Sequence, residues 1–380
     1  MQKILLVFGT RPEAIKMFPL MKELKKYKTD FNVLVCVTAQ HREMLDQVLK
    51  FFDIIPDFDL NIMTNNQSLS TLTASVLSSM ETVLNKSRPD FVLVHGDTTT
   101  SFSASLACFY KGIPVGHIEA GLRTHNMLAP FPEEFNRKVV GQIVKWHFAP
   151  TELSKKNLLN ENIPKENIWV TGNTVIDSLK YILKNFKDNK NHTSAVNKKF
   201  QTILGFNIKE KKIILITGHR RENFGLGFKK ICAALKELAI KYKDINFVFP
   251  VHLNPLVINP VKHYLGMVNN IKILNPLPYQ EFVFLLKHSY IILTDSGGLQ
   301  EEASSLGIPV FVMRETTERP EAIQSGIINL VGTKTKMIVN EVSELIENKK
   351  MYLHTAKPNN IYGDGLASQR IVKVLRNLNE

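Results

Sequence analysis

Four titratable side chains follow short apolar runs or a proline-rich turn, where functional groups of parallel sheets collect. They are Asp97, Glu119, Glu133 and His219. Carboxylates and imidazoles that converge on one place suit general acid and base catalysis, because burial and mutual fields move their pKa values apart. Taken one at a time, each is more simply explained as a helix cap or a salt-bridge partner.

Two glycine-containing turns have the composition of anion-binding sites. The first is the segment 9–13, Gly-Thr-Arg-Pro-Glu, which opens a helix carrying Lys16. The second is 294–298, Thr-Asp-Ser-Gly-Gly, with Glu302 one turn into the helix that follows. Backbone N–H groups at a helix N-terminus attract phosphate, and a carboxylate there can accept both hydroxyls of a ribose. Neither segment is a Walker loop, and an ordinary strand-to-helix turn remains an alternative for both.

Other residues limit the class of protein. His-Ile-Glu at 117–119 has the spacing of zinc deaminases but lacks their Cys-x-x-Cys partner, so we expect no metal. Cys36, Cys108 and Cys232 form neither a disulfide framework nor a zinc motif, which favours a reducing compartment. The apolar run 4–8 is too short for a signal peptide, and no run has the length of a membrane span. We expect a soluble, cytoplasmic protein.

The charge balance is strongly basic. The chain has 48 Lys and Arg against 35 Asp and Glu, a formal net charge of +13. Such a surface could attract nucleic acid, a membrane or a phosphorylated small molecule. Most of the excess is dispersed lysine, including the Lys- and Asn-rich stretch 184–199, and no aromatic-basic motif accompanies it. The sequence therefore favours a solvated basic surface and no nucleic-acid or membrane partner.

Apolar runs alternate with amphipathic stretches in both halves of the 380-residue chain, which is typical of βαβ units and parallel sheets. We predict an α/β protein of two Rossmann-like, doubly wound domains facing a cleft. The predicted divisions are a first domain at 1–187, a linker region at 188–212, a second domain at 213–365, and a C-terminal helix at 366–380 that packs back on the first domain.

Nine ordered motifs resemble those of the bacterial non-hydrolysing UDP-N-acetylglucosamine 2-epimerases. They lie at 8–17, 38–47, 95–98, 117–123, 171–174, 218–222, 251–255, 294–298 and 317–322. The resemblance runs from Phe8 to at least Gly365. It implies a glycosyltransferase-B-like fold, UDP held mainly by the second domain, no cofactor or metal, and a homodimer formed through the first domain.

The resemblance also implies roles for individual residues. Those implied to be catalytic are Asp97, Glu119, Glu133 and His219. Those implied to hold UDP are Arg11, Lys16, Leu277, Phe282, Ser296, Gly297, Gly298, Glu302 and Arg319. Some relatives bind a second UDP-N-acetylglucosamine as an activator, and Gln40, Gln67 and His252 match that allosteric site. Asn66, however, stands where several of those relatives carry Arg.

The implied reaction is reversible epimerisation at carbon 2 of UDP-N-acetylglucosamine, giving UDP-N-acetylmannosamine for bacterial surface polysaccharide. UDP leaves by anti elimination to form 2-acetamidoglucal, and it adds back after protonation of the other face. Cations suit the departing diphosphate, and two acid/base groups suit proton removal and return on opposite faces. The sequence does not assign base and acid among the four candidates.

Three other functions remain to be separated by experiment. A hydrolysing epimerase of the same fold would release free N-acetylmannosamine and UDP. A retaining glycosyltransferase of the same fold would require an acceptor. A basic module that binds RNA or the envelope surface would show steeply salt-dependent affinity and no turnover of sugar nucleotide.

Overall fold

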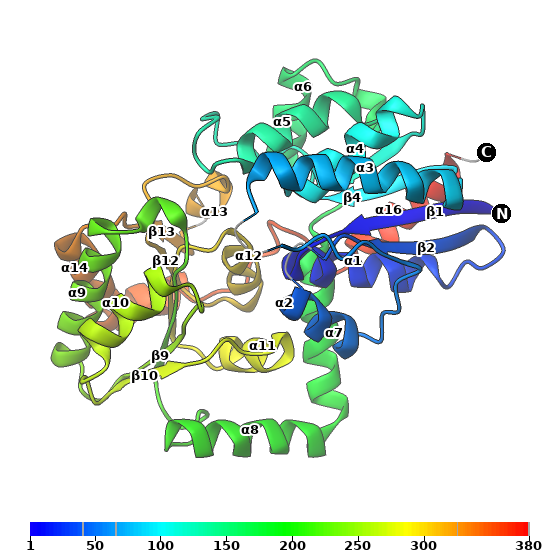
Figure 1. Cartoon of the computed structure of the whole chain (residues 1–380). Coiled ribbons are helices and arrows are strands. Elements are labelled where there is room, and N and C mark those ends of the chain that lie inside the picture. Colours follow the sequence, from blue (N-terminus) through cyan, green and yellow to red (C-terminus); the bar gives the residue numbers. More distant parts are fainter. Residues whose placement is uncertain (40–41, 65–66, 325, 379–380) are drawn as a thin grey trace. The chain divides into compact units, whose positions relative to one another are not determined.

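Strands and helices alternate along the whole chain, and a computed structural model shows how they are grouped (Figure 1). The structure describes residues 1–39, 42–64, 67–324 and 326–378. One compact unit comprises Met1–Ser178 and Tyr362–Glu380, and the second comprises Leu179–Ile361.

The first unit is built on a parallel seven-stranded sheet with the order β3-β2-β1-β4-β5-β6-β7. Its strands are β1 (Gln2–Phe8), β2 (Phe31–Val37), β3 (Phe58–Asp59), β4 (Phe91–His95), β5 (Val115–Ile118), β6 (Trp146–Ala149) and β7 (Ile168–Val170). The central strands are apolar at nearly every position, because helices cover both faces of the sheet.

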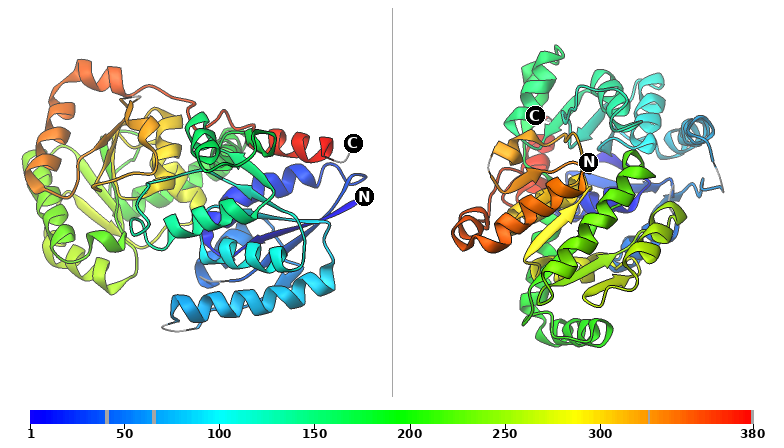
Figure 2. Two further views of the ribbon diagram at one scale, coloured as in Figure 1. Left: turned by 90° about the horizontal axis from the view of Figure 1, so that it is seen from above. Right: turned by 90° about the vertical axis from the view of Figure 1, so that its left-hand side faces the viewer.

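The helices of this unit form a layer on each face of the sheet. They are α1 (Arg11–Leu24), α2 (Arg42–Phe51), α3 (Leu69–Ser87), α4 (Thr99–Tyr110), α5 (Glu133–Ile143), α6 (Glu152–Asn160), the first residues of α7 (Thr174–Asp188), and α16 (Ala367–Asn377), with a 3₁₀ turn at Lys165–Asn167. Helices α3 and α4 lie on one side of the strands, and α1 and α16 lie on the other (Figure 2). The last helix of the chain packs against the first, and Arg376 Nε donates to Asp30 at 2.7 Å.

The second unit contains a parallel six-stranded sheet with the order β10-β9-β8-β11-β12-β13. Its strands are β8 (Ile213–Thr217), β9 (Asn246–Pro250), β10 (Ile271–Leu274), β11 (Ile291–Thr294), β12 (Val310–Val312) and β13 (Ile328–Leu330). Its helices are α8 (Lys190–Leu204), α9 (Leu226–Lys241), α10 (Pro255–Leu265), α11 (Tyr279–Lys287), α12 (Gly297–Leu306), α13 (Pro320–Gln324), α14 (Thr335–Glu347) and α15 (Lys349–Thr355), with a 3₁₀ turn at Arg221–Asn223.

Two helices span the stretch where the sequence predicted a domain end and a linker. Helix α7 begins in the first unit and ends in the second, and most of 188–212 forms α8. This segment is polar yet helical, because Val196, Phe200 and Leu204 recur every four residues and bury one face.

In both sheets the strand order reverses beside the first strand of the unit, between β1 and β4 and between β8 and β11. The predicted fold class of two Rossmann-like α/β domains is therefore confirmed. Ligands of doubly wound sheets bind at such reversal points, outside the carboxyl ends of the strands. Those two edges carry most of the residues selected from the sequence.

Candidate active site

A buried carboxylate organises the reversal point of the first sheet. Glu13 in α1 accepts the backbone N–H groups of Gly9 (3.0 Å) and Thr10 (2.7 Å) and the hydroxyl of Thr98 (2.6 Å), which follows β4. Thr10 and Glu13 form a capping box, in which each satisfies backbone N–H groups at the start of the helix. Burial raises the pKa of Glu13, and the bond from Thr98 opposes that shift.

Glu119 lies at the carboxyl end of β5 in a buried polar cluster. Its side chain forms an ion pair with Lys16 of α1 and accepts Asn173 Nδ2 at 2.6 Å. The residue has a positive φ of 67°, an unusual conformation for a glutamate that is held here by its neighbours. His95 Nε2 lies 3.9 Å from the carboxylate. The Glu119 carboxylate is thus fixed between a cation and an amide at the predicted catalytic edge.

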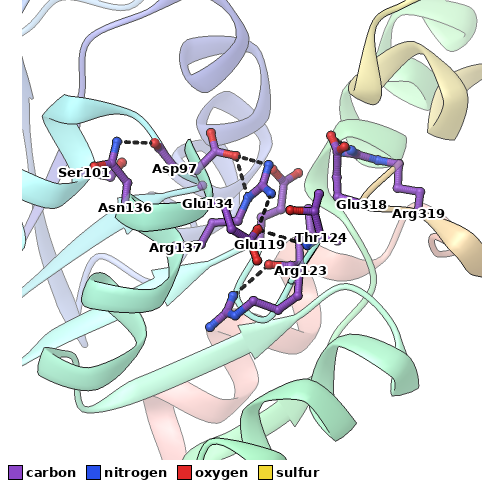
Figure 3. A network of polar contacts seen from close by, with 12 residues as sticks. Asp97, Ser101, Glu119, Arg123, Thr124, Glu134, Asn136, Arg137, Glu318 and Arg319 are labelled. Atoms are coloured by element: carbon purple, nitrogen blue, oxygen red, sulfur yellow. Dashed lines mark hydrogen bonds and ion pairs between the residues drawn. The ribbon is translucent and has the colours of Figure 1, made fainter. Parts of the chain in front are cut away.

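Asp97, which follows β4, is held by Arg137 of α5 (Figure 3). Arg137 Nε donates to the Asp97 carboxylate at 2.8 Å, and Arg137 Nη1 donates to Glu134 at 3.0 Å. Glu134 is fully buried and also accepts the backbone N–H groups of Thr124 and His125. Asp97 keeps 24% of its side chain exposed, so it remains within reach of a ligand.

Three buried histidines lie on the neighbouring strands β4, β5 and β6. They are His95, His117 and His147, each at most 2% exposed. Burial lowers the pKa of His95 and His117 to about 4 and that of His147 to about 3. His117 Nε2 bonds the carbonyl of Gly96 at 2.7 Å. These rings are neutral near pH 7 and add no positive charge beneath the carboxylates.

The second sheet also has a buried carboxylate at its reversal point. Asp295, directly after β11, accepts the backbone N–H groups of His219 and Arg220, each at 2.9 Å, and Asn223 Nδ2 at 3.3 Å. The His219 side chain is 43% exposed and its ring stacks on that of His252, with 5.7 Å between centroids. Burial lowers the pKa of His219, and the nearby Asp295 carboxylate opposes that shift.

The N-terminus of α12 has the form that the sequence predicted for an anion site. Ser296 is the N-cap residue, and its side chain makes no capping bond to the described residues. A Cβ on Gly297 would collide with Arg319 and Glu318, whereas one on Gly298 would meet no described atom within 4 Å. One turn along, Glu302 accepts the hydroxyl of Tyr279 at 2.8 Å. Backbone N–H groups and a fixed carboxylate therefore lie at one helix end.

A chain of buried ion pairs lies beside that helix end. Arg319 bonds both Glu301 and Glu318, and Arg314 Nη1 bonds the other oxygen of Glu318 at 3.0 Å. Arg314 Nε also donates to Glu222 at 2.7 Å, in the loop that carries His219. Both guanidinium groups are at least 96% buried. The carboxylates hold Arg319 in one orientation and tie two loops of the second unit together.

The structure groups the selected residues by unit. Arg11, Lys16, Asp97, Glu119 and Glu133 lie at the carboxyl edge of the first sheet, with Glu133 in the first turn of α5. The second unit contributes His219, Leu277, Phe282, Ser296, Gly297, Gly298, Glu302 and Arg319. Lys16 was assigned to the diphosphate, and here its ammonium group pairs with Glu119.

The residues of the suggested activator site are divided between the units. Gln40 lies outside the described residues, as does Asn66. Gln67 immediately precedes Ser68, the N-cap of α3. His252 follows β9 and packs on His219.

Several residues of these clusters were not selected from the sequence. They are Glu13, Arg137, Asn173, Asp295, Glu301, Arg314 and Glu318. Asp295 directly follows β11, and Asn173 lies in the short loop between β7 and α7, positions that could have identified them. Among the described residues, no three His, Cys, Asp or Glu side chains come together as a metal site.

Comparisons with known proteins give the family. The family described as UDP-N-acetylglucosamine 2-epimerase matches residues 22–376. The chain belongs to the UDP-N-acetylglucosamine 2-epimerase family. It is 52% identical to the UDP-N-acetylglucosamine 2-epimerase of Campylobacter jejuni, over 98% of each chain. It is 51% identical to that of Escherichia coli K12, over 99% of this chain and 98% of the relative.

Solved structures of this epimerase family have the same fold. The UDP-GlcNAc 2-epimerase of Neisseria meningitidis bound to UDP-GlcNAc is 52% identical, with a TM-score of 0.95 over 99% of this chain and 100% of that one. The enzyme of Methanocaldococcus jannaschii in complex with UDP-GlcNAc and UDP is 33% identical, with a TM-score of 0.87 over 99% of each chain. The glycosyltransferase-B-like fold class is thereby confirmed.

Proposed function

We propose that this chain epimerises UDP-N-acetylglucosamine and UDP-N-acetylmannosamine at carbon 2, without hydrolysis. The observation that carries the proposal is the full-length similarity to a solved 2-epimerase bound to UDP-GlcNAc. Supporting it, the first sheet holds ionisable carboxylates at its carboxyl edge, and the second unit offers a helix N-terminus beside Arg319. Those are the two kinds of site that the reaction requires.

In the first step, a base of the first unit removes the proton from carbon 2. The electron pair of that C–H bond forms the C1=C2 double bond, and the C1–O bond breaks with its electrons leaving on UDP. The products of this step are 2-acetamidoglucal and UDP. In the second step, a UDP oxygen attacks C1 again while an acid protonates C2 from the opposite face. Atoms and charge balance without an oxidant or reductant.

Asp97, Glu119, Glu133 and His219 are proposed as the acid and base groups. Glu119 forms an ion pair with Lys16, and Asp97 forms one with Arg137, so a cation holds each carboxylate in place. His219 is half exposed at the reversal point of the second sheet, where its ring can meet a ligand. Inversion at carbon 2 needs more than one group that exchanges a proton, which supports proposing several of these residues.

UDP is proposed to bind the second unit. The N–H groups at the start of α12 and the Arg319 guanidinium favour the diphosphate, and its negative charge grows as the C1–O bond breaks. Glu302 is proposed to accept the ribose hydroxyls, and Leu277 and Phe282 are proposed to lie near the uracil. Arg11 and Lys16 are further cations proposed to attract the phosphates. A second UDP-N-acetylglucosamine is proposed as an activator at Gln40, Gln67 and His252.

The chain is further proposed to act in the cytoplasm as a homodimer formed through its first unit. Its three cysteines are free and buried, which suits a reducing compartment. Among the described residues, no helix has the length and apolar character needed to cross a membrane. Phe109 and Tyr110, at the end of α4, are 57% and 69% exposed in the single chain, as expected of residues covered by a partner. A monomeric mass at micromolar concentration would refute the dimer.

Proton NMR of UDP-N-acetylglucosamine incubated with the enzyme in deuterated water tests the activity. We expect both epimers to form, each with deuterium at carbon 2, with neither a nicotinamide nor an acceptor present. Accumulation of free N-acetylmannosamine would instead identify a hydrolysing epimerase. Turnover only after addition of an acceptor would identify a glycosyltransferase.

A further inference from the structure

A cavity in the second unit lies away from the carboxyl edge of its sheet. It has a volume of about 450 Å³, and its lining residues come from the end of α7, from α8, from α11 and its C-terminal end, and from the loop before β8. The residues that line it are Leu183, Lys184, Phe186, Lys187, Thr193, Lys209, Phe284, Lys287 and His288. None of them belongs to the site proposed for the epimerase reaction.

The floor of this cavity is apolar and closely packed. Phe284 is 1% exposed, meets Phe186 edge to face at 5.3 Å and stacks on Phe200 at 5.9 Å. The hydroxyl of Thr193 donates to the carbonyl oxygens of Phe186 and Asn189, which leaves it committed to the backbone. A floor of this kind favours a planar or aliphatic group that displaces water from it.

The rim of the cavity is uniformly basic. It consists of the exposed lysines Lys184, Lys187, Lys209 and Lys287, and none of their ammonium groups pairs with a carboxylate of the residues that the structure describes. No Asp or Glu is among the described residues that line the cavity. The nearby carboxylate of Glu281 is already bonded to Lys199 at 2.6 Å. Four ammonium groups around one opening attract an anion more strongly than dispersed lysines do.

We propose that this cavity binds a small organic anion whose apolar body lies on the phenylalanine floor and whose phosphate or carboxylate contacts the lysine rim. An inorganic ion would make no apolar contact with the phenylalanine floor. A neutral apolar molecule would not pair with the charges of the lysine rim. The volume lies within the range of small-molecule sites and is too small for a folded partner. The Lys-rich stretch beginning at 184 thereby acquires a function that epimerisation does not require.

Phenyl phosphate is a suitable probe, titrated calorimetrically into the full-length protein with UDP present to occupy the nucleotide site. Inorganic phosphate and methyl phosphate are the reference ligands. Because the phenyl ring buries apolar surface, we expect phenyl phosphate to bind about tenfold more tightly than either reference. Intermolecular NOEs between the phenyl protons and the Leu183 methyl groups would localise the ligand to the cavity.

A charge-reversed variant, Lys184→Glu/Lys187→Glu/Lys287→Glu, tests the rim. Its matched control is Lys229→Glu/Lys230→Glu/Lys236→Glu, which reverses the same number of exposed lysines on α9. We expect the first to lose about tenfold or more in affinity for phenyl phosphate and the control to retain it. Equal binding of phenyl and inorganic phosphate, an equal loss in both variants, or no saturable binding would each overturn the proposal.

Discussion

A buried carboxylate lies at the reversal point of each sheet, but the two come from different parts of their units. Glu13 comes from the helix directly after β1 and caps N–H groups three and four residues away. Asp295 comes from the far strand β11 and caps N–H groups 75 and 76 residues away. In both units, the loop after the first strand has backbone N–H groups that need an acceptor. In the first unit a carboxylate nearby in sequence accepts them, and in the second unit a carboxylate distant in sequence does so.

The two edges also differ in charge. In the first unit, Asp97 and Glu119 each form an ion pair with one cation, Arg137 and Lys16 respectively. In the second, Arg314 and Arg319 lie among the three carboxylates of Glu222, Glu301 and Glu318. The first arrangement suits proton transfer, and the second holds a guanidinium rigidly for an anionic ligand.

The largest effect should come from neutralising the carboxylates of the first unit. Asp97→Asn, Glu119→Gln and Glu133→Gln should each lower turnover by about a hundredfold or more, because a positioned acid or base contributes about 10²- to 10⁴-fold. Glu166→Gln, at an exposed position of the same unit, is the control. Steady-state kinetics of epimer formation measure the effect. Near-normal turnover in any one variant removes that residue from the catalytic set.

Acid should destabilise the first unit more than the second. The pKa values of His95 and His117 are lowered to about 4, while unfolded histidine titrates near 6.5. Between those values the unfolded chain binds protons that the folded chain does not, so the free energy of unfolding falls as pH falls from about 6.5 to about 4. For each histidine, the free energy of unfolding falls by at most about 3 kcal/mol, since one pKa unit corresponds to about 1.4 kcal/mol.

Hydrogen exchange of the β4–β6 amides at pH 7 and pH 5 measures this loss. Glu13, with its raised pKa, acts in the opposite sense, since its stabilising contribution is present below about 4.5 and is lost as pH rises through its folded pKa. In His147→Asn, unfolding should take up to one proton fewer, so the free energy of unfolding should depend less on pH. The control His354→Asn, at an exposed position, should leave that pH dependence unchanged. Earlier loss of protection in the second unit would contradict the comparison.

Replacing each capping carboxylate by the corresponding amide should lower the free energy of unfolding by different amounts. In Glu13→Gln the new NH₂ group can face the hydroxyls of Thr98 and Ser101, which rotate to accept it. In Asp295→Asn both positions face N–H donors of His219 and Arg220. We expect unfolding free energies lower by about 1 kcal/mol for the first variant and about 2–3 kcal/mol for the second. Equal losses in denaturant titrations would show that the two caps are equivalent.

A further pair of predictions concerns the residues proposed to bind the nucleotide. Arg319→Lys should lower both turnover and UDP affinity, because diphosphate charge increases in the transition state. Glu302→Gln should weaken UDP by about ten- to hundredfold, or about 1.5–3 kcal/mol, with little change in turnover. Tyr279→Phe, which removes the hydroxyl bonded to Glu302, is a control for positioning alone. If Glu302→Gln weakens pyrophosphate as much as UDP, the ribose assignment is wrong.

The contrast between contacts local in sequence and contacts between distant residues also explains which features could be predicted from the sequence. Strands β4 and β8 and helix α4 can be recognised in the sequence, because a buried parallel strand and its helix have strong local patterns. Strands β3, β7 and β13 have only two or three residues and leave no pattern. The Thr10–Glu13 capping box is visible in the sequence, whereas nothing local indicates that Asp295 caps His219.

Site residues with a local signal in the sequence were predicted, and those defined by distant partners were not. Asp97 and Glu119 were found because they stand at strand ends. Arg137 and Arg314 were not selected, because an arginine buried between carboxylates is defined by long-range partners such as Asp97 and Glu222. The pairing of Lys16 with Glu119 joins residues 103 positions apart and depends on the register of the folded sheet.

The division of labour between the units is tested most directly by calorimetric titration of UDP into Glu119→Gln and Arg319→Lys, side by side with the unmodified chain. We predict that Glu119→Gln binds UDP within about twofold of the unmodified affinity despite its lost turnover, and that Arg319→Lys binds about tenfold more weakly. Loss of UDP affinity in Glu119→Gln as large as that in Arg319→Lys would contradict the assignment of proton transfer to the first unit and nucleotide binding to the second.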